Sequence, residues 1–195
     1  MTDQLFLSLW LNRHSRATRL RYFEQLLRLF PFSQREQPQS TISIQAVDAT
    51  QPPLLEQPVN GPLDPSNVIA SLHEYEGEDV AYRVESWWDL WQFDSGEAKL
   101  GPTRVALSCF GPEFDEGSAS GQEDLRIDFG VDSNFLPQPD VPGSATFIES
   151  NIKSLLRLVH EVESTLPVAK RRLETESGQN FADRLQNVLR AATTQ

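Results

Sequence analysis

Residues 123–132 read EDLRIDFGVD. Apolar side chains stand at every second position from Leu125 to Val131, and charged side chains fill most of the positions between them. Successive side chains of a β-strand point to opposite faces, so this stretch has one apolar face and one polar face. A strand of this kind is typical of an antiparallel sheet that packs one face on a core and turns the other to solvent.

Further stretches extend this sheet in both directions along the chain. Residues 80–93 and 103–110 precede it and are rich in β-branched and aromatic residues, and the short polar or Gly-containing connections favour a meander. Residues 4–12 alternate with four leucines on one face, and residues 41–48 alternate again.

A helix is expected between the first two of these strands. Ser15 is a suitable N-cap, and Pro31 ends the segment. The competing interpretation is a single long helix from Asp3 to Phe30. The apolar residues that recur at helical spacing are Leu20, Phe23, Leu26, Leu27 and Phe30.

Five prolines between Ala49 and Pro65 predict a long, stiff surface connection. Asp64 followed by Pro65 has the pattern of an N-cap and a first helical residue, so a short helix is expected to follow as far as Tyr75. Gly77 ends it.

The C-terminal part predicts two helices. Thr146 and Glu149 have the spacing of a capping box, Leu166-Pro167 interrupts the helix that follows, and Asn180 is the next N-cap. The apolar positions of the first helix are Ile148, Ile152, Leu155, Val159 and Val162, and those of the second are Phe181, Leu185, Val188 and Leu189.

These elements predict an α+β fold in the order β-α-β-α-β-β-β-α-α. Its mostly antiparallel sheet has about five strands, and its helices pack on one face and include a C-terminal helical pair. We expect residues 1–195 to form a single domain on which residues 146–195 pack as a helical segment.

The net charge of −11 is unevenly distributed along the chain. Residues 1–35 carry +4, residues 36–150 carry −17 and residues 151–195 carry +2. This balance argues against a nucleic-acid-binding surface, which needs a cationic face, and we expect the terminal helices to offset part of the acidic middle. No apolar run approaches the length of a membrane span, and a cytoplasmic location is expected.

The Trp-rich stretch is the most unusual part of the composition. In a strand, Trp87 and Trp91 share one face while Trp88 shares the other with Leu90. Exposed tryptophans are frequent in binding hot spots, whereas buried ones are core residues. Since both faces are apolar here, we expect the second face to be covered by a loop, by a partner or by another copy of the chain.

A second candidate site joins the first strand to the first helix. Arg13, His14, Ser15 and Arg16 stand at an expected helix N-terminus, where free N–H groups and two arginines would suit a phosphate or a carboxylate. The glycines of the usual phosphate loops are missing, and a plain N-cap with solvated arginines is the alternative.

No residue pattern predicts a metal site, a cofactor or a catalytic centre. The acids Glu113, Asp115 and Glu116 only loosely approach a calcium loop, and Glu85 with Asp89 is a carboxylate pair of a kind that chance supplies. Cys109, the single cysteine, shares a strand face with apolar residues and is expected to be buried.

The sequence therefore favours a non-enzymatic protein-interaction or assembly module, which binds a protein partner or itself through the Trp-rich strand. The alternatives are a binder of anions or nucleotide-type ligands at Arg13–Arg16 and a small enzyme that uses dispersed carboxylates.

Overall fold

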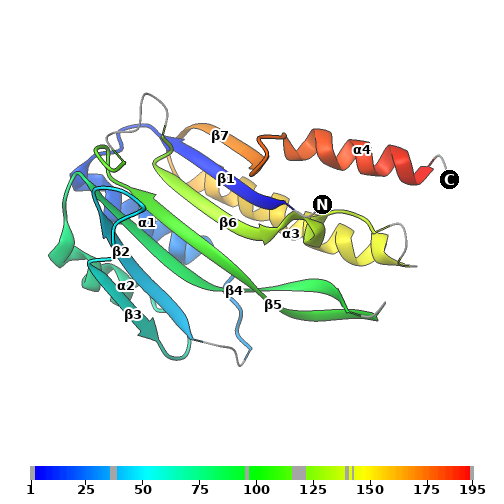
Figure 1. The fold of residues 1–195 in the computed structure, drawn as a ribbon, viewed down its shortest axis with the longest axis horizontal. Coiled ribbons are helices and arrows are strands. Elements are labelled where there is room, and N and C mark those ends of the chain that lie inside the picture. The colour runs from blue at the N-terminus through cyan, green and yellow to red at the C-terminus, as the bar shows by residue number, and fades with distance from the viewer. Residues whose placement is uncertain are drawn as a thin grey trace.

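Seven strands form one antiparallel sheet in the computed structural model (Figure 1), which describes residues 3–35, 39–94, 97–115, 122–138, 141 and 143–193. Of residues 94 and 188–193 it describes the backbone alone, so the side chains of Val188 and Leu189 lie outside it, as does Glu116. The spatial order is β3-β2-β4-β5-β6-β1-β7. The strands are β1 (Gln4–Leu11), β2 (Ser40–Ala46), β3 (Leu55–Val59), β4 (Val80–Asp94), β5 (Glu97–Phe110), β6 (Leu125–Val131) and β7 (Val168–Thr175). The α+β class and the antiparallel sheet are confirmed, whereas the expected number of about five strands is wrong.

The two strands that were not predicted are the two edges of the sheet. β3 lies inside the proline-rich connection, and its one neighbouring strand is β2. Pro58 has no N–H, but on an edge strand this position can face solvent, so no hydrogen bond between β2 and β3 is lost. β7 reads VAKRRLET, a largely polar run whose one neighbouring strand is β1, and Glu174 near its end forms a further antiparallel bridge with Asn180. Residues 146–195 are therefore not a helical pair, because this strand separates the two helices.

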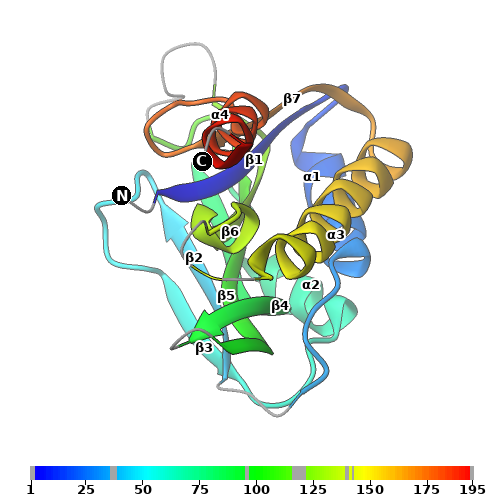
Figure 2. The same cartoon turned by 90° about the vertical axis from the view of Figure 1, so that its right-hand side faces the viewer.

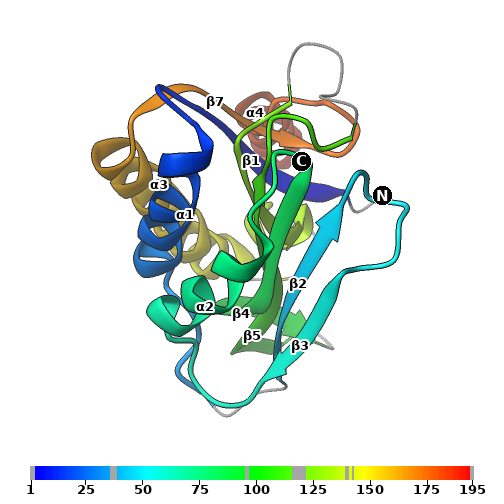
Figure 3. The same cartoon turned by 90° about the vertical axis from the view of Figure 1, so that its left-hand side faces the viewer.

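The helices are α1 (Arg16–Leu29), α2 (Pro65–Leu72), α3 (Ser144–Thr165) and α4 (Phe181–Thr193), with single 3-10 turns η1 (His73–Tyr75) and η2 (Asp132–Phe135). α1, α2 and α3 lie together on one side of the sheet, and none of these three lies on the other side (Figures 2 and 3). α4 follows β7 and extends past the N-terminal end of β1 (Figure 1).

Local signals explain where most helices begin. Asp64 accepts a hydrogen bond from the N–H of Ser66 (2.9 Å) at the start of α2, and Asn180 accepts one from Ala182 (2.9 Å) at the start of α4. α3 begins two residues before the predicted capping box, because Gly143 enters the helix in a left-handed conformation with φ of 78°. The alternative of one long N-terminal helix is wrong, since a turn through Arg13 (φ of 62°) separates β1 from α1.

The core lies between the sheet and α1 to α3. Leu5, Leu7, Leu9 and Leu11 of β1 are all buried, as the alternation predicted. Trp88 is the centre of an aromatic cluster and is only 4% exposed. Its ring centroid lies 5.6 Å from Phe30, 5.8 Å from Phe129 and 6.0 Å from Phe135.

The C-terminal helix is attached through a buried ion pair and an aromatic contact. Arg184 Nη2 of α4 lies 2.6 Å from Asp132 Oδ2, and Asp132 is 1% exposed. Phe181 stacks edge-on against Phe135 at 6.4 Å. Together with the Arg16–Glu76 pair (3.6 Å), the Arg184–Asp132 pair confirms that the terminal helices offset part of the acidic middle.

One surface turn is strained. Val47 has a φ of 73°, a left-handed conformation in which its branched side chain is unfavourable. Two backbone hydrogen bonds hold it there, since Val47 N–H donates to Asp79 (2.9 Å) and its carbonyl accepts from Asp115 (2.6 Å).

Candidate partner-binding surface

The Trp-rich strand is β4, and its tryptophans have different surroundings. Trp88 and Leu90 point toward the helices and are buried, so a partner would reach Trp88 only if the core opened. Trp87 and Trp91 are half-buried. The strand therefore uses one tryptophan for the core and leaves two in reach of the surface.

Trp91 stands where β4 runs beyond its neighbour β2. Asn151 of α3 takes the place of a paired strand there, because its amide accepts from the N–H of Trp91 (2.9 Å) and donates to its carbonyl (2.8 Å). Phe147 packs on the Trp91 ring with the centroids 4.6 Å apart. The contacts of Trp91 are therefore largely internal.

The side of the sheet away from α1, α2 and α3, here called the open face, carries a regular row of residues. Six strands contribute alternating serines and arginines that lie opposite one another across the sheet. In order from β2 to β7 they are Ser43, Arg83, Ser108, Arg126, Ser8 and Arg172. Neighbouring strands are about 4.8 Å apart, so the arginine Cα atoms repeat about every 10 Å. Ser8 and Ser108 are buried (both 4% exposed), because the longer neighbouring side chains rise above them.

An adjacent row carries acids. Glu85 of β4 and Asp128 of β6 lie on either side of Ala106 of β5. Arg83 donates to Glu85 (3.0 Å), and Arg104 contacts the other carboxylate oxygen of Glu85. Burial alone would raise the pKa of Glu85, but the hydrogen bonds from Arg104 and Arg83 outweigh this and lower its pKa overall.

A hollow of about 490 Å³ lies over Ala106, the smallest side chain of this row. Its walls include Gln4, Arg83, Glu85, Arg104 and Asp128. Arg104 is the most accessible of the ion-paired groups that line this hollow, with 67% of its side chain exposed. The hollow therefore offers donors and acceptors side by side, as a polar protein interface does.

Aromatic rings accompany the cations toward β7. Lys170 Nζ lies 4.5 Å from the ring centroid of Trp10, and the Arg172 guanidinium lies 5.6 Å from the same centroid. Arg126 lies over the rings of Phe6 and Phe110 at 5.4 and 5.7 Å. Such contacts hold the long side chains flat on the sheet.

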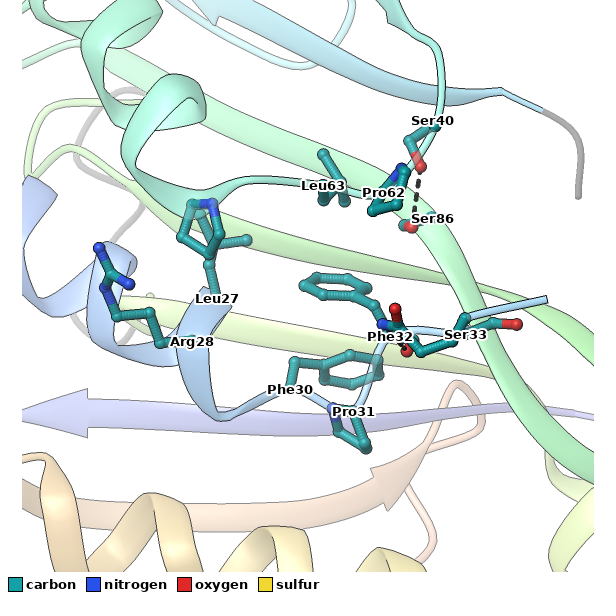
Figure 4. Close-up of a pocket in the computed structure, with 13 residues that line it drawn as sticks. Leu27, Arg28, Phe30, Pro31, Phe32, Ser33, Ser40, Pro62, Leu63 and Ser86 are labelled. Atoms are coloured by element: carbon teal, nitrogen blue, oxygen red, sulfur yellow. Dashed lines mark hydrogen bonds between the residues drawn. The ribbon is translucent and has the colours of Figure 1, made fainter. Parts of the chain in front are cut away.

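A separate cleft of about 350 Å³ lies between the end of α1 and the segment that leads into α2 (Figure 4). Phe30, Phe32 and Pro62 give it apolar walls, and the hydroxyls of Ser40 and Ser86 lie 2.9 Å apart at its back. Among the described residues that line it, Arg28 is the one charged group, and it already pairs with Glu24 at 2.7 Å. The cleft suits a small apolar group with one polar atom, and these described lining residues include no carboxylate or histidine for acid–base chemistry.

The predicted anion site is mostly engaged within the chain. His14 Nδ1 lies 2.9 Å from Asp124, and only 6% of the His14 side chain is exposed. Ser15 pairs with Thr18 in a capping box. Arg16 pairs with Glu76, whereas Arg13 is exposed in the turn. These contacts reduce the charge that the N-terminus of α1 can present to an anion.

The remaining chemical groups are dispersed. Within the described part of the chain no cluster of His, Cys, Asp and Glu has the geometry of a metal site. Glu85 and Asp89 have different partners, because Asp89 accepts from Ser33 (2.7 Å) rather than approaching Glu85 as a pair. Cys109 is fully buried, which raises the pKa of its thiol.

Sequence reasoning missed the Ser–Arg row because its members are far apart along the chain. Each strand contributes one ordinary polar residue to it, and only the registers of five strand pairs bring the six together. A search for charged residues at equivalent positions of the predicted strands would have found only Arg83 and Arg126, because Arg172 lies on β7, which was not predicted.

Comparison of the chain with known protein families, curated proteins and solved structures finds no match. None of the helices in the described ranges is long and apolar enough to cross a membrane.

Proposed function

We propose that the chain is a non-enzymatic protein-interaction module that binds a protein surface of mixed charge on the open face of its sheet. The observation that carries the proposal is the gathering of arginines, lysine and aromatic rings on this face. Arginine and tryptophan are enriched in binding hot spots, and here Trp10 and Trp87 stand among the arginines.

The chemistry of the face favours a protein over a nucleic acid. The acidic row of Glu85, Asp128 and Glu174 lies beside the arginine row. Phosphates along a nucleic-acid backbone would meet these carboxylates as well as the arginines, and the chain as a whole carries −11. A protein surface can place an acid opposite each arginine and a donor opposite each carboxylate.

Site-specific photo-crosslinking tests the proposal. A photoreactive phenylalanine is placed at Arg104 on the open face and, as a matched control, at Arg157, which is exposed on α3 at the other side of the sheet. We expect a discrete protein adduct from position 104 and none from position 157 when the chain is expressed in its host.

The charge reversal Arg104→Glu, combined with Arg172→Glu, is expected to remove partner retention in a pull-down of that crosslinked protein. Arg157→Glu is the control and is expected to leave retention unchanged. Equal crosslinking from both positions, or an adduct with nucleic acid instead of protein, would overturn the proposal.

A further inference from the structure

The edge of β4 is covered by two different segments of the chain. β2 pairs with it as far as Glu85. Beyond that point the segment after α1 takes over, and the N–H of Ser33 donates to the carbonyl of Trp87 (2.8 Å). Ser86 therefore stands at the junction between the two covering segments. The cleft of about 350 Å³ opens at this junction (Figure 4).

Two serines of the junction occupy positions that the strand pattern assigns to the core. Side chains of a strand alternate between its two faces, so Ser40 shares a face with the buried Ile42 of β2, and Ser86 shares one with the buried Trp88 of β4. Both serines are buried as well, at 6% and 3% exposed. Large apolar residues at these two positions would fill the cleft, whereas the serines leave it open and place two hydroxyls at its back.

The two hydroxyls carry one hydrogen more than they use between them. Their oxygens lie 2.9 Å apart and either can be the donor, so one hydrogen lies between Ser40 and Ser86. The second hydrogen has no acceptor among the described residues. A buried donor without an acceptor is unfavourable, so this hydrogen marks where an oxygen atom of a ligand would bind.

The rest of the cleft is apolar and small. Phe30 and Phe32, whose ring centroids are 4.9 Å apart, come from one side, and Pro62 and Leu63 come from the other (Figure 4). The volume lies near the lower end of the range for ligand sites, which is roughly 300–1,000 Å³. At about 30 Å³ for each water molecule it would hold about a dozen waters, which corresponds to a ligand of about ten non-hydrogen atoms.

The charges around the cleft favour an uncharged ligand. Arg28, the one charged group among the described lining residues, already contacts Glu24 (2.7 Å) and Ser66 (2.6 Å). A carboxylate bound at the serine pair would lose its hydration in exchange for a single O–H donor, which does not compensate for the burial of a charge. A carbonyl oxygen needs only one donor and therefore fits this site.

A free small molecule suits the cleft better than a side chain of a partner protein. The anchor residue of a protein interface is normally surrounded by further contacts that exclude water. The large apolar residues that are most exposed in the described part of the chain are Val47, Leu54 and Leu156, and none of these three lines the cleft. A partner protein would therefore find little apolar surface to bury around it.

We propose that this cleft binds a small uncharged molecule with one carbonyl group and an aromatic or branched aliphatic body. The carbonyl oxygen accepts the free hydrogen of the Ser40–Ser86 pair, and the body lies between Phe30, Phe32 and Pro62. The cleft lies beside α1, on the other side of the sheet from the open face. The site therefore stands whether or not the open face binds a protein partner.

Two probes of equal size test the proposal in an NMR titration. Acetophenone has a phenyl ring and a carbonyl group, and 2-phenylpropene has a CH2 group in place of the carbonyl oxygen. We expect acetophenone to bind with a dissociation constant of about 1 mM, within the usual binding energy per atom for so small a ligand. It should shift the amide signals of Phe32, Ser40 and Ser86, whereas the amide of Ser108 on the open face should not shift.

Serine variants separate the hydrogen bond from the shape of the cleft. Ser40→Ala and Ser86→Ala each leave one hydroxyl with a free hydrogen, so each should bind acetophenone within about twofold of the original chain. The double variant has no donor and should bind acetophenone about fivefold more weakly, the size of one hydrogen bond, while 2-phenylpropene binds at least as well as before. Removing both partners of a buried hydrogen bond is nearly neutral for stability, so the double variant should stay folded.

Ser177→Ala is the matched control, because the hydroxyl of Ser177 lies 2.9 Å from that of Thr175 in a pair that does not line the cleft. It should leave the binding of both probes unchanged, as should Arg104→Glu on the open face. The absence of amide shifts up to about 10 mM acetophenone would mean that the cleft holds water only, and would overturn the inference. Acetophenone binding that the double serine variant retains in full, or an equal loss of both probes in that variant, would also overturn it.

Discussion

Replacing Trp88 by alanine measures how much of the fold depends on the aromatic cluster. The indole is 4% exposed and contacts three rings, at 5.6, 5.8 and 6.0 Å. Truncation of a buried tryptophan costs about 3–5 kcal/mol, and each aromatic pair adds about 0.5–1.5 kcal/mol beyond the buried area. We therefore expect the free energy of unfolding to fall by about 4–5 kcal/mol, at the upper end of the range.

Trp87→Ala is the matched control. Trp87 immediately precedes Trp88 in the same strand, so both variants lose the preference of tryptophan for strands equally. Unlike Trp88, however, Trp87 is only half-buried and points to the open face. We expect it to cost about 1 kcal/mol, near the average for single substitutions. Urea unfolding followed by far-UV circular dichroism gives both values. A loss for Trp88→Ala no larger than that for Trp87→Ala would refute the assignment of Trp88 to the core.

Four further outcomes follow from individual contacts. Arg184→Ala leaves the buried carboxylate of Asp132 without its cation and should cost about 3 kcal/mol, with faster chymotrypsin cleavage in α4. Val47→Gly should raise stability by about 1 kcal/mol in thermal unfolding, because glycine adopts a positive φ without strain. Because the pKa of Glu85 is lowered in the folded state, its ionised form stabilises the fold at pH values above the ordinary glutamate pKa, and this stabilisation is lost as the pH falls through the folded-state pKa. Glu85→Gln should therefore reduce the loss of stability at acid pH, measured by urea unfolding at a series of pH values. Cys109 should react with a thiol reagent only after denaturant is added, because it is buried and its pKa is raised.

The sequence predicted the elements that carry a strong apolar pattern. The apolar residues of β1 and β6 alternate, and those of α1 recur at helical spacing up to a proline. Each of these elements buries one face, so its apolar residues repeat with the period of a strand or of a helix. β7 was missed for the opposite reason. An edge strand with exposed Lys170, Arg171 and Arg172 has no buried face over most of its length and leaves no period to detect.

The candidate surfaces could be predicted only in part. The alternation placed Trp87 and Trp88 on opposite faces, but the composition alone did not show which face the helices cover. The Ser–Arg row arises from strand register, which long-range pairing determines and local sequence does not.

The position of β1 has a consequence for how the chain is made. β1 precedes the other strands in the described sequence, yet its partners on both sides are β6 (Leu125–Val131) and β7 (Val168–Thr175). The apolar face formed by the four buried leucines of β1 therefore lacks its full set of neighbouring strands until residue 175 has been synthesised. Such non-local pairing slows folding and leaves apolar surface exposed in the meantime.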